Sequence, residues 1–259
     1  EVFRDVTRER KLELELIERN KKMSKDLLFA KRLQRRILPK KDIYNTIKID
    51  HLYEPSEVLS GDMFDVYYID EENIGIYICD VVGHGVTASM MTMFVRQTMR
   101  AIKDDILSPS IALTELHKRF VTLNLGIDKY FTIFYAVYNT KDNHFKYANA
   151  GHNCIPIKFN REELTLLKTS GFPISLIFNE IYYEENDIKL KKGDKILFYT
   201  DGITEGKNIK GIEFGMEGVV KAIKENKDNL LKSIVNNVEK FRWGEQEDDY
   251  AMVLMEVLL

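Results

Sequence analysis

The feature that most constrains the fold is a series of short apolar runs that begins after residue 42 and continues almost to the C-terminal end. Many of them alternate apolar and polar side chains, which is typical of antiparallel strands with one buried face. The runs are Ile47–Tyr53, Met63–Ile69, Ile74–Asp80, Phe131–Tyr138, His144–Ala150, Glu163–Thr169, Ile181–Ile188, Lys195–Thr200 and Tyr250–Val257. Stretches with helical spacing come in pairs: about Val86–Lys103 with Ser110–Asn124, and about Met216–Glu225 with Asn229–Phe241. Strands grouped around paired helices predict an α+β fold rather than βαβ alternation.

The first 38 residues follow another pattern, because they contain no Gly or Pro and are rich in Glu, Lys, Arg and Leu. Their apolar residues have a/d-type spacing: Leu12, Leu16, Met23, Leu27, Ala30 and Ile37. This spacing predicts a helix that Pro39 ends. For residues 1–24 a parallel coiled coil and a helix packed on its own domain both stay open, and for residues 25–38 domain packing is favoured. We therefore expect a helical linker at 1–41 and a domain at 42–259.

The net charge of −3 is divided unevenly along the chain. Residues 1–41 carry 14 Lys/Arg and 7 Asp/Glu, whereas the remainder carries 24 and 34. An acidic domain argues against nucleic acid as its substrate, because a phosphate backbone needs a basic surface. No apolar stretch approaches the ~20 residues of a membrane span, and no signal peptide is visible. A chain that begins with Glu1 instead of Met is expected to be a piece of a longer protein.

The chain has only two cysteines, Cys79 and Cys154, and each lies in or next to an apolar run. They are expected to be small core residues rather than members of a disulfide framework. This pattern fits a reducing compartment. We therefore expect a cytoplasmic protein.

Four aspartates stand on short turns at the ends of the apolar runs. They are Asp62 in Ser60-Gly61-Asp62, Asp80 in Asp80-Val81-Val82-Gly83-His84-Gly85, Asp201 in Thr200-Asp201-Gly202, and Asp248 in Glu247-Asp248-Asp249. Each of them alone is more simply explained as a turn or cap residue. Several carboxylates that converge at strand ends indicate a cation, because an unpaired buried carboxylate is costly. An all-oxygen ligand set suits Mg²⁺ or Mn²⁺ better than zinc.

The residues around Asp80 predict a sharp turn. Gly83 and Gly85 permit such a turn and a close approach of backbone. A helix that begins near Val86 would direct its positive end at the turn, which favours phosphate.

Two further acidic residues accompany the four. In a regular strand, Asp62 and Asp65 lie on opposite faces, so both need not line one site. Asp248 and Asp249 are adjacent and also point opposite ways, so only one of them should face a cation.

In this order the motifs resemble the PPM family of metal-dependent type 2C Ser/Thr protein phosphatases, in its bacterial SpoIIE-like branch. The matching stretches are Ala30–Gln34 through Leu38-Pro39, Glu57–Asp65, Asp80–Val86, Asn149–Asn153, Gly171–Ile174, Tyr199–Glu205, Phe214-Gly215 and Asp248-Asp249. The resemblance covers about residues 28–257. It implies a four-layer αββα sandwich of two antiparallel sheets flanked by helices.

The resemblance also implies roles for individual residues. Asp80 would bridge two Mn²⁺ or Mg²⁺ ions, and the backbone carbonyl of Val81 would meet the second ion. Asp201 and Asp248 would complete the coordination of the first ion. Asp62 would lie near the second ion and act through water. Two such ions lower the pKa of a shared water and neutralise phosphoryl charge, so no covalent phosphoenzyme is needed.

Some positions depart from the family pattern or keep two interpretations. Val82 stands where Ser is common and Ala251 where Thr is frequent, but neither is a ligand position. No arginine occupies an obvious phosphate-clamping position, so affinity would rest on the metals and on protein contacts. His152 is either a general acid or, the favoured interpretation, a turn residue that binds backbone. The Met-rich helix after Gly85 is core or, as the family implies, also a regulatory switch.

The resemblance thus implies a phosphoserine/phosphothreonine protein phosphatase within a partner-switching pathway. Its substrate would be a small phosphoprotein of the anti-sigma-factor-antagonist type. The longer chain would have an N-terminal sensor, and the helix at 1–38 could form a homodimer. One alternative is an interaction module of the same fold that no longer catalyses, against which the intact aspartate set argues. Another is a metallonuclease, which the acidic balance of residues 42–259 disfavours.

Overall fold

The computed structural model describes residues 7–102, 106–225 and 229–259, and the chain divides into two compact units, Glu1–Ile37 and Leu38–Leu259. The described part of the first unit is α1 (Thr7–Arg36), whose last turn carries Arg35 and Arg36 at the negative end of the helix. Its seam residues Leu12, Leu16 and Met23 are 53%, 59% and 62% exposed. The predicted helical residues 1–6 and the predicted helix end at Lys103 lie outside the described residues.

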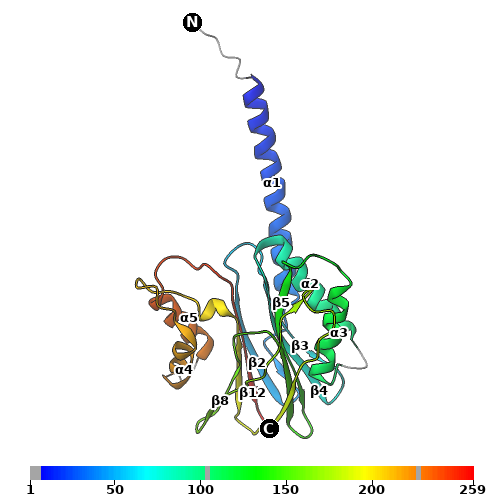
Figure 1. Cartoon of the computed structure of the whole chain (residues 1–259). Helices are drawn as coiled ribbons and strands as arrows, with labels where there is room; N and C mark the ends of the chain where they lie inside the picture. Colours follow the sequence, from blue (N-terminus) through cyan, green and yellow to red (C-terminus); the bar gives the residue numbers. More distant parts are fainter. Residues whose placement is uncertain (1–6, 103–105, 226–228) are drawn as a thin grey trace. The chain divides into compact units, whose positions relative to one another are not determined.

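The second unit contains two antiparallel sheets packed face to face (Figure 1). The first sheet has the order β1 (Ile43–Tyr44), β2 (Ile47–Glu54), β12 (Tyr250–Val257), β11 (Lys195–Tyr199), β7 (Ile157–Phe159) and β8 (Leu164–Leu166). The second has the order β10 (Glu185–Lys189), β6 (His144–Ala150), β5 (Tyr130–Asn139), β4 (Asn73–Val81) and β3 (Asp62–Tyr68), and β9 (Ile174–Ser175) also pairs with β5.

The core between the sheets consists of β-branched, aromatic and other apolar side chains from both. Phe134 of β5 meets Phe198 of β11, with ring centroids 6.0 Å apart. Ile76 and Val253 are completely buried in the same core, and burial of one such side chain contributes about 1.5–3 kcal/mol. The alternating pattern of the runs therefore produces the buried face of each sheet.

Paired helices cover the outer faces of both sheets (Figure 1). On the second sheet, α2 (Gly85–Ala101) packs on β3 and β4, and α3 (Pro109–Val121) packs on β6 and β9. On the first sheet, α4 (Gly215–Glu225) and α5 (Leu230–Phe241) share an apolar cluster with β11 and β12. The predicted α+β fold with αββα layering is confirmed. No helix in the described part of the chain combines the length and the apolar character needed to cross a membrane.

The short strands differ from the sequence-based expectation. The strand predicted at Glu163–Thr169 comprises only Leu164–Leu166, and the strand predicted at Ile181–Ile188 begins at Glu185. The sequence did not predict β1, β7 or β9, which have two or three residues each. Such strands are set by the partner that they reach rather than by a local pattern.

A buried carboxylate joins α2 to the second sheet. Asp65, in β3, is fully buried and accepts hydrogen bonds from Arg100 Nε at 2.7 Å and Arg100 Nη2 at 3.0 Å. The Nε atom of Arg96, one helical turn away, lies 3.4 Å from the same carboxylate. Asp65 therefore faces the helix layer. Asp62 bonds to Thr200 of the other sheet instead, so the two aspartates lie on opposite faces, as predicted.

Candidate metal centre

The four aspartates of the predicted site lie at one end of the two sheets. Asp62 opens β3 and Asp80 stands one residue before the end of β4, directly opposite Asp62 in the β3–β4 ladder. Asp201 follows β11 in a 3₁₀ turn, and Asp248 precedes β12. Directly opposed residues of an antiparallel pair share a face. The β3–β4 pairing therefore holds Asp62 beside Asp80. The pairing of β11 with β12 brings together the turns that carry Asp201 and Asp248.

The electrostatics of these carboxylates show that they interact across the sheets. Burial, and then the charges of Asp201 and Asp248, raise the pKa of Asp80 to about 8. Burial, and then the charges of Asp248 and Glu205, raise the pKa of Asp201 to about 6. Burial and the Asp80 charge raise the pKa of Asp62 well above the usual carboxyl range. Partial desolvation of its carboxyl group also raises the pKa of Asp248, although the residue as a whole is exposed. The acidic cluster therefore favours protons or cations.

No basic side chain in the described ranges neutralises the cluster, because none of their ion pairs includes one of the four aspartates. One exposed ion pair beside the Asp80 turn joins His84 Nδ1 to Glu57 Oε1 at 3.1 Å. His84 therefore binds a neighbouring carboxylate rather than one of the four.

Two glycines bring the aspartate-bearing turns into backbone contact. A Cβ atom on Gly61 would lie 2.8 Å from the carbonyl oxygen of Gly83 and 2.9 Å from that of Val81. A Cβ atom on Gly202 would overlap the carbonyl oxygen of Asp249. The turn before Asp62 thus lies against the end of β4, where the Val81 carbonyl is found, and the turn after Asp201 lies against the residues that precede β12.

The turn after Asp80 has the predicted geometry. Gly83 and Gly85 have φ values of +87° and +76°, a region that L side chains rarely adopt. α2 then begins at Gly85. The positive end of this helix therefore lies at the same turn as Asp80.

Asp249 is buried, and both oxygens of its carboxylate accept hydrogen bonds from neighbouring protein groups. Its Oδ1 atom accepts hydrogen bonds from the Ser56 amide at 2.7 Å and the Ser56 hydroxyl at 3.0 Å. Its Oδ2 atom accepts from the Ser60 hydroxyl at 2.6 Å and the Gly61 amide at 2.9 Å. Asp248 is exposed. The two adjacent acids thus have different surroundings, and Asp249 holds the turn that leads into Asp62.

His152 is 3% exposed, and burial lowers its pKa to about 4. Its Nε2 atom lies 3.0 Å from the Tyr199 carbonyl oxygen and its Nδ1 atom 3.2 Å from the Thr132 hydroxyl. Both ring nitrogens are thus engaged, and the ring binds backbone, as the turn interpretation predicts. A general acid would need a free ring nitrogen that can reach the substrate.

Two neighbours of Asp201 were not singled out from the sequence. The Thr200 hydroxyl donates to Asp62 Oδ2 at 2.7 Å and accepts a hydrogen bond from the Ala251 amide at 3.1 Å. The Glu205 charge raises the pKa of both Asp80 and Asp201, so Glu205 belongs to the acidic cluster. In the sequence, the only signal for these two residues was their closeness to Asp201: Thr200 comes one residue before it and Glu205 four residues after it.

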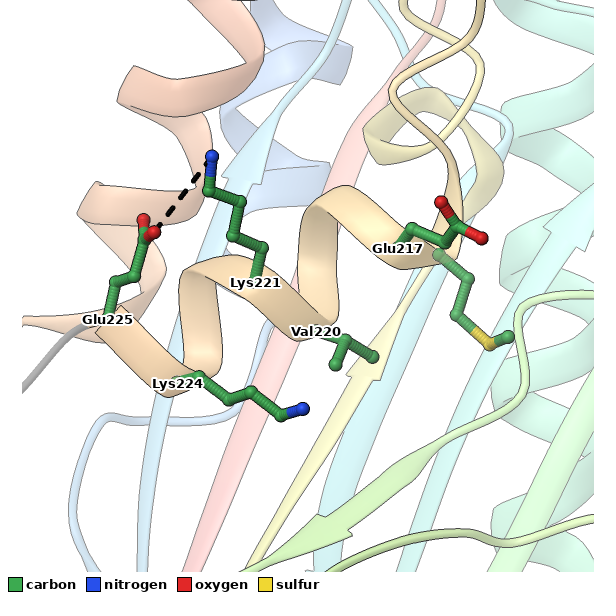
Figure 2. Close-up of a pocket in the computed structure, with 6 residues that line it drawn as sticks. Glu217, Val220, Lys221, Lys224 and Glu225 are labelled. Atoms are coloured by element: carbon green, nitrogen blue, oxygen red, sulfur yellow. Dashed lines mark ion pairs between the residues drawn. The ribbon is translucent and has the colours of Figure 1, made fainter.

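The donor set fits a divalent cation of the Mg²⁺ or Mn²⁺ class, because it offers carboxylate and carbonyl oxygens and no base from the described ranges neutralises it. No three His, Cys, Asp or Glu side chains of the described residues form a ready-made ligand group. A surface hollow of about 420 Å³ lies elsewhere, along α4 (Figure 2). It is lined by Met216, Glu217, Val220, Lys221, Lys224 and Glu225, and includes none of the four aspartates.

Comparison with known proteins gives matches over most of the chain. Residues 70–258 match the model of the family described as Stage II sporulation protein E (SpoIIE). Phosphoserine phosphatase RsbU of Bacillus subtilis (strain 168) is 28% identical over 206 residues, which cover 78% of this chain and 60% of RsbU. Phosphoserine phosphatase RsbP of the same organism is 25% identical over 237 residues, which cover 90% of this chain and 58% of RsbP. The chain thus spans about three fifths of each of these relatives.

Solved structures show the same fold. The SiaA-PP2C domain of Pseudomonas aeruginosa matches with a TM-score of 0.79 and 20% identity, over 92% of this chain and 98% of that domain. The catalytic domain of the serine threonine protein phosphatase PstP in complex with 2 manganese ions matches with a TM-score of 0.59 and 13% identity. The match covers 82% of this chain and 99% of that domain. With a family match over more than half of its length, the chain belongs to the SpoIIE family, and it shares the fold of the SiaA-PP2C domain.

Proposed function

We propose that this chain is a metal-dependent phosphoserine/phosphothreonine protein phosphatase. The observation that carries the proposal is the cluster of Asp62, Asp80, Asp201 and Asp248. The charges of Asp201 and Asp248 raise the pKa of Asp80, the Asp80 charge raises the pKa of Asp62, and no ion pair among the described residues neutralises any of the four. Membership of the SpoIIE family supports the same chemistry, and RsbU and RsbP are named phosphoserine phosphatases.

The cofactor would be two Mn²⁺ or Mg²⁺ ions, and the PstP structure with 2 manganese ions supports this choice. Asp80 would contact both ions, Asp201 and Asp248 the first, and the Val81 carbonyl the second. Asp62 would lie near the second ion and act through water. When bound, such ions lower the pKa of a water molecule and offset charge on the phosphoryl oxygens.

The other residues of the site would keep these ligands in place. Thr200 fixes the Asp62 carboxylate through a hydrogen bond of 2.7 Å. Asp249 fixes the backbone before Asp62 through the Gly61 amide. The ligands of the two sheets would therefore be oriented before a substrate arrives.

The substrate would be a phosphoprotein of the anti-sigma-factor-antagonist type, recognised in the cytoplasm through protein contacts rather than a basic phosphate clamp. The acidic balance of residues 42–259 supports the exclusion of nucleic acid. In the longer protein an N-terminal sensor would act through α1. The exposed side chains of Leu12, Leu16 and Met23 support a homodimer formed along this helix.

Turnover of p-nitrophenyl phosphate with Mn²⁺ tests the chemistry, and calorimetry tests the binding of the metal. Asp80→Asn should lower turnover at least about a hundredfold, as expected for the loss of one electrostatic contact in a transition state. Asp187→Asn makes the same chemical change at an exposed residue of β10 that pairs with His144, and should leave turnover unchanged.

Absence of both metal-dependent turnover and metal binding in the wild type would refute the proposal. Metal binding without turnover of p-nitrophenyl phosphate or of any phosphoprotein would instead favour a non-catalytic interaction module of the same fold.

A further inference from the structure

His152 is held rigidly in the loop between β6 and β7. Asn149 Oδ1 accepts a hydrogen bond from the His152 amide at 2.7 Å, and Asn149 Nδ2 donates to the His152 carbonyl at 3.1 Å. Gly151 has a φ of +74°, and a Cβ atom there would lie 2.6 Å from the Pro173 ring. Only glycine therefore fits before His152. Gly151 and the Asn149 side chain together fix the backbone of His152, and so the place from which its imidazole projects.

The partners of the ring fix its tautomer. The Tyr199 carbonyl, 3.0 Å from Nε2, can only accept a hydrogen bond, so Nε2 carries the proton. The buried ring is neutral because burial lowers its pKa to about 4. Its Nδ1 atom therefore accepts the hydrogen bond from the Thr132 hydroxyl at 3.2 Å.

These two partners belong to different sheets and lie next to the aspartates. Thr132 is in β5 and stands directly opposite Asp80 in the β4–β5 ladder. Tyr199 ends β11, two residues before Asp201. One imidazole thus joins the strand beside Asp80 to the strand that leads into Asp201. Most other contacts between the sheets are apolar and impose no such fixed spacing.

We propose that His152 is a positioning residue that sets the separation between Asp80 and Asp201, and thereby the affinity of the site for a divalent cation. The inference rests on the proposed function of these aspartates as metal ligands. It assigns His152 no contact with the substrate, which agrees with its burial.

The test measures the dissociation constant of Mn²⁺ by calorimetry on the whole chain, together with unfolding in urea without metal. His152→Leu removes both hydrogen bonds, and Thr132→Val removes one at nearly constant volume. Each should weaken Mn²⁺ binding about tenfold, as the loss of an outer-shell contact does in other metal sites. His152→Gln keeps an amide N–H that can reach Tyr199, and should bind more tightly than His152→Leu.

His117→Leu is the matched control, because His117 is fully buried and its Nε2 lies 3.0 Å from the Ser175 carbonyl, within the second sheet and its covering helix. It should lose stability and keep Mn²⁺ affinity within about twofold. A merely structural role for His152 would give the same result in His152→Leu and His117→Leu.

Folded His152→Leu that binds Mn²⁺ within about twofold of wild type overturns the inference while the proposed function stands. If His152→Leu does not fold, Thr132→Val decides, since it removes only a hydroxyl. A wild type that binds no Mn²⁺ and hydrolyses nothing overturns the proposed function and the inference together.

Discussion

Replacement of Asp249 by alanine should destabilise the metal-free protein, although Asp249 is not a proposed metal ligand. Its carboxylate is 5% exposed and accepts four hydrogen bonds. Ser56 is partly exposed, so water can replace its share of these bonds. The bonds from Ser60 and Gly61 are buried and are the ones whose loss matters.

The magnitude follows from these two bonds. The Gly61 amide would be left buried without its acceptor, at a cost of about 1–3 kcal/mol, and the Ser60 hydroxyl would lose a bond to a charged acceptor, worth about 1.5–3 kcal/mol. Removal of the Asp249 charge offsets part of this loss, because that charge raises the pKa of Asp62 and Asp80. We expect a net loss of roughly 2–4 kcal/mol, and about half of that for Asp249→Asn, which keeps an oxygen acceptor.

Urea unfolding in a chelator, followed by circular dichroism, gives the free energy of unfolding directly. Asp248→Ala is the matched control, since Asp248 is exposed and its charge raises the pKa of Asp80 and Asp201. This variant should keep its stability within about 1 kcal/mol and lose Mn²⁺ affinity. If Asp249→Ala is as stable as wild type within about 0.5 kcal/mol, the assignment of Asp249 as the residue that holds the Ser60-Gly61 turn is wrong.

Two further predictions concern the acidic cluster and α1. The pKa values of about 8 for Asp80 and about 6 for Asp201 lie above the unfolded value of ~3.9, so the metal-free folded state binds more protons than the unfolded state. Its stability should therefore fall as the pH rises from about 4 to 8, with a smaller slope in Asp80→Asn; a urea midpoint that rises with pH would contradict this. In α1, Leu16→Glu with Met23→Glu should convert a dimer to a monomer in sedimentation, whereas Lys21→Glu, off the seam, should not. A wild type that is already monomeric would exclude this dimer.

The layers of the fold could be predicted from the sequence because the burial of each long strand leaves a recognisable pattern of apolar residues. β4, for example, lies between the other sheet and α2, so Ile74–Cys79 is a nearly continuous apolar run. β7 and β9 have three and two residues, too few for a periodic pattern, and they exist because β11 and β5 offer them partners.

The aspartates could be found from the sequence because each stands where an apolar run begins or ends. Their different roles came from the order of the motifs, and these roles remain a proposal. The contacts around them could not be predicted from local pattern. Asp249 and Ser60 are 189 positions apart, and His152 and Tyr199 are 47 apart. Only the docking of one sheet on the other brings such pairs together.

The close packing at Gly61 and Gly202 bears on how the protein folds. The backbone of one turn occupies the place where a side chain of the other would begin. Changes of side-chain rotamer therefore cannot correct the fit once the aspartate-bearing turns have met, and the two backbones must dock together. Contacts of such long sequence separation form late, after most loop-closure entropy has been lost. The cluster should therefore assemble in the last step of folding, and a bound cation should slow global unfolding more than it slows the local opening of any single loop.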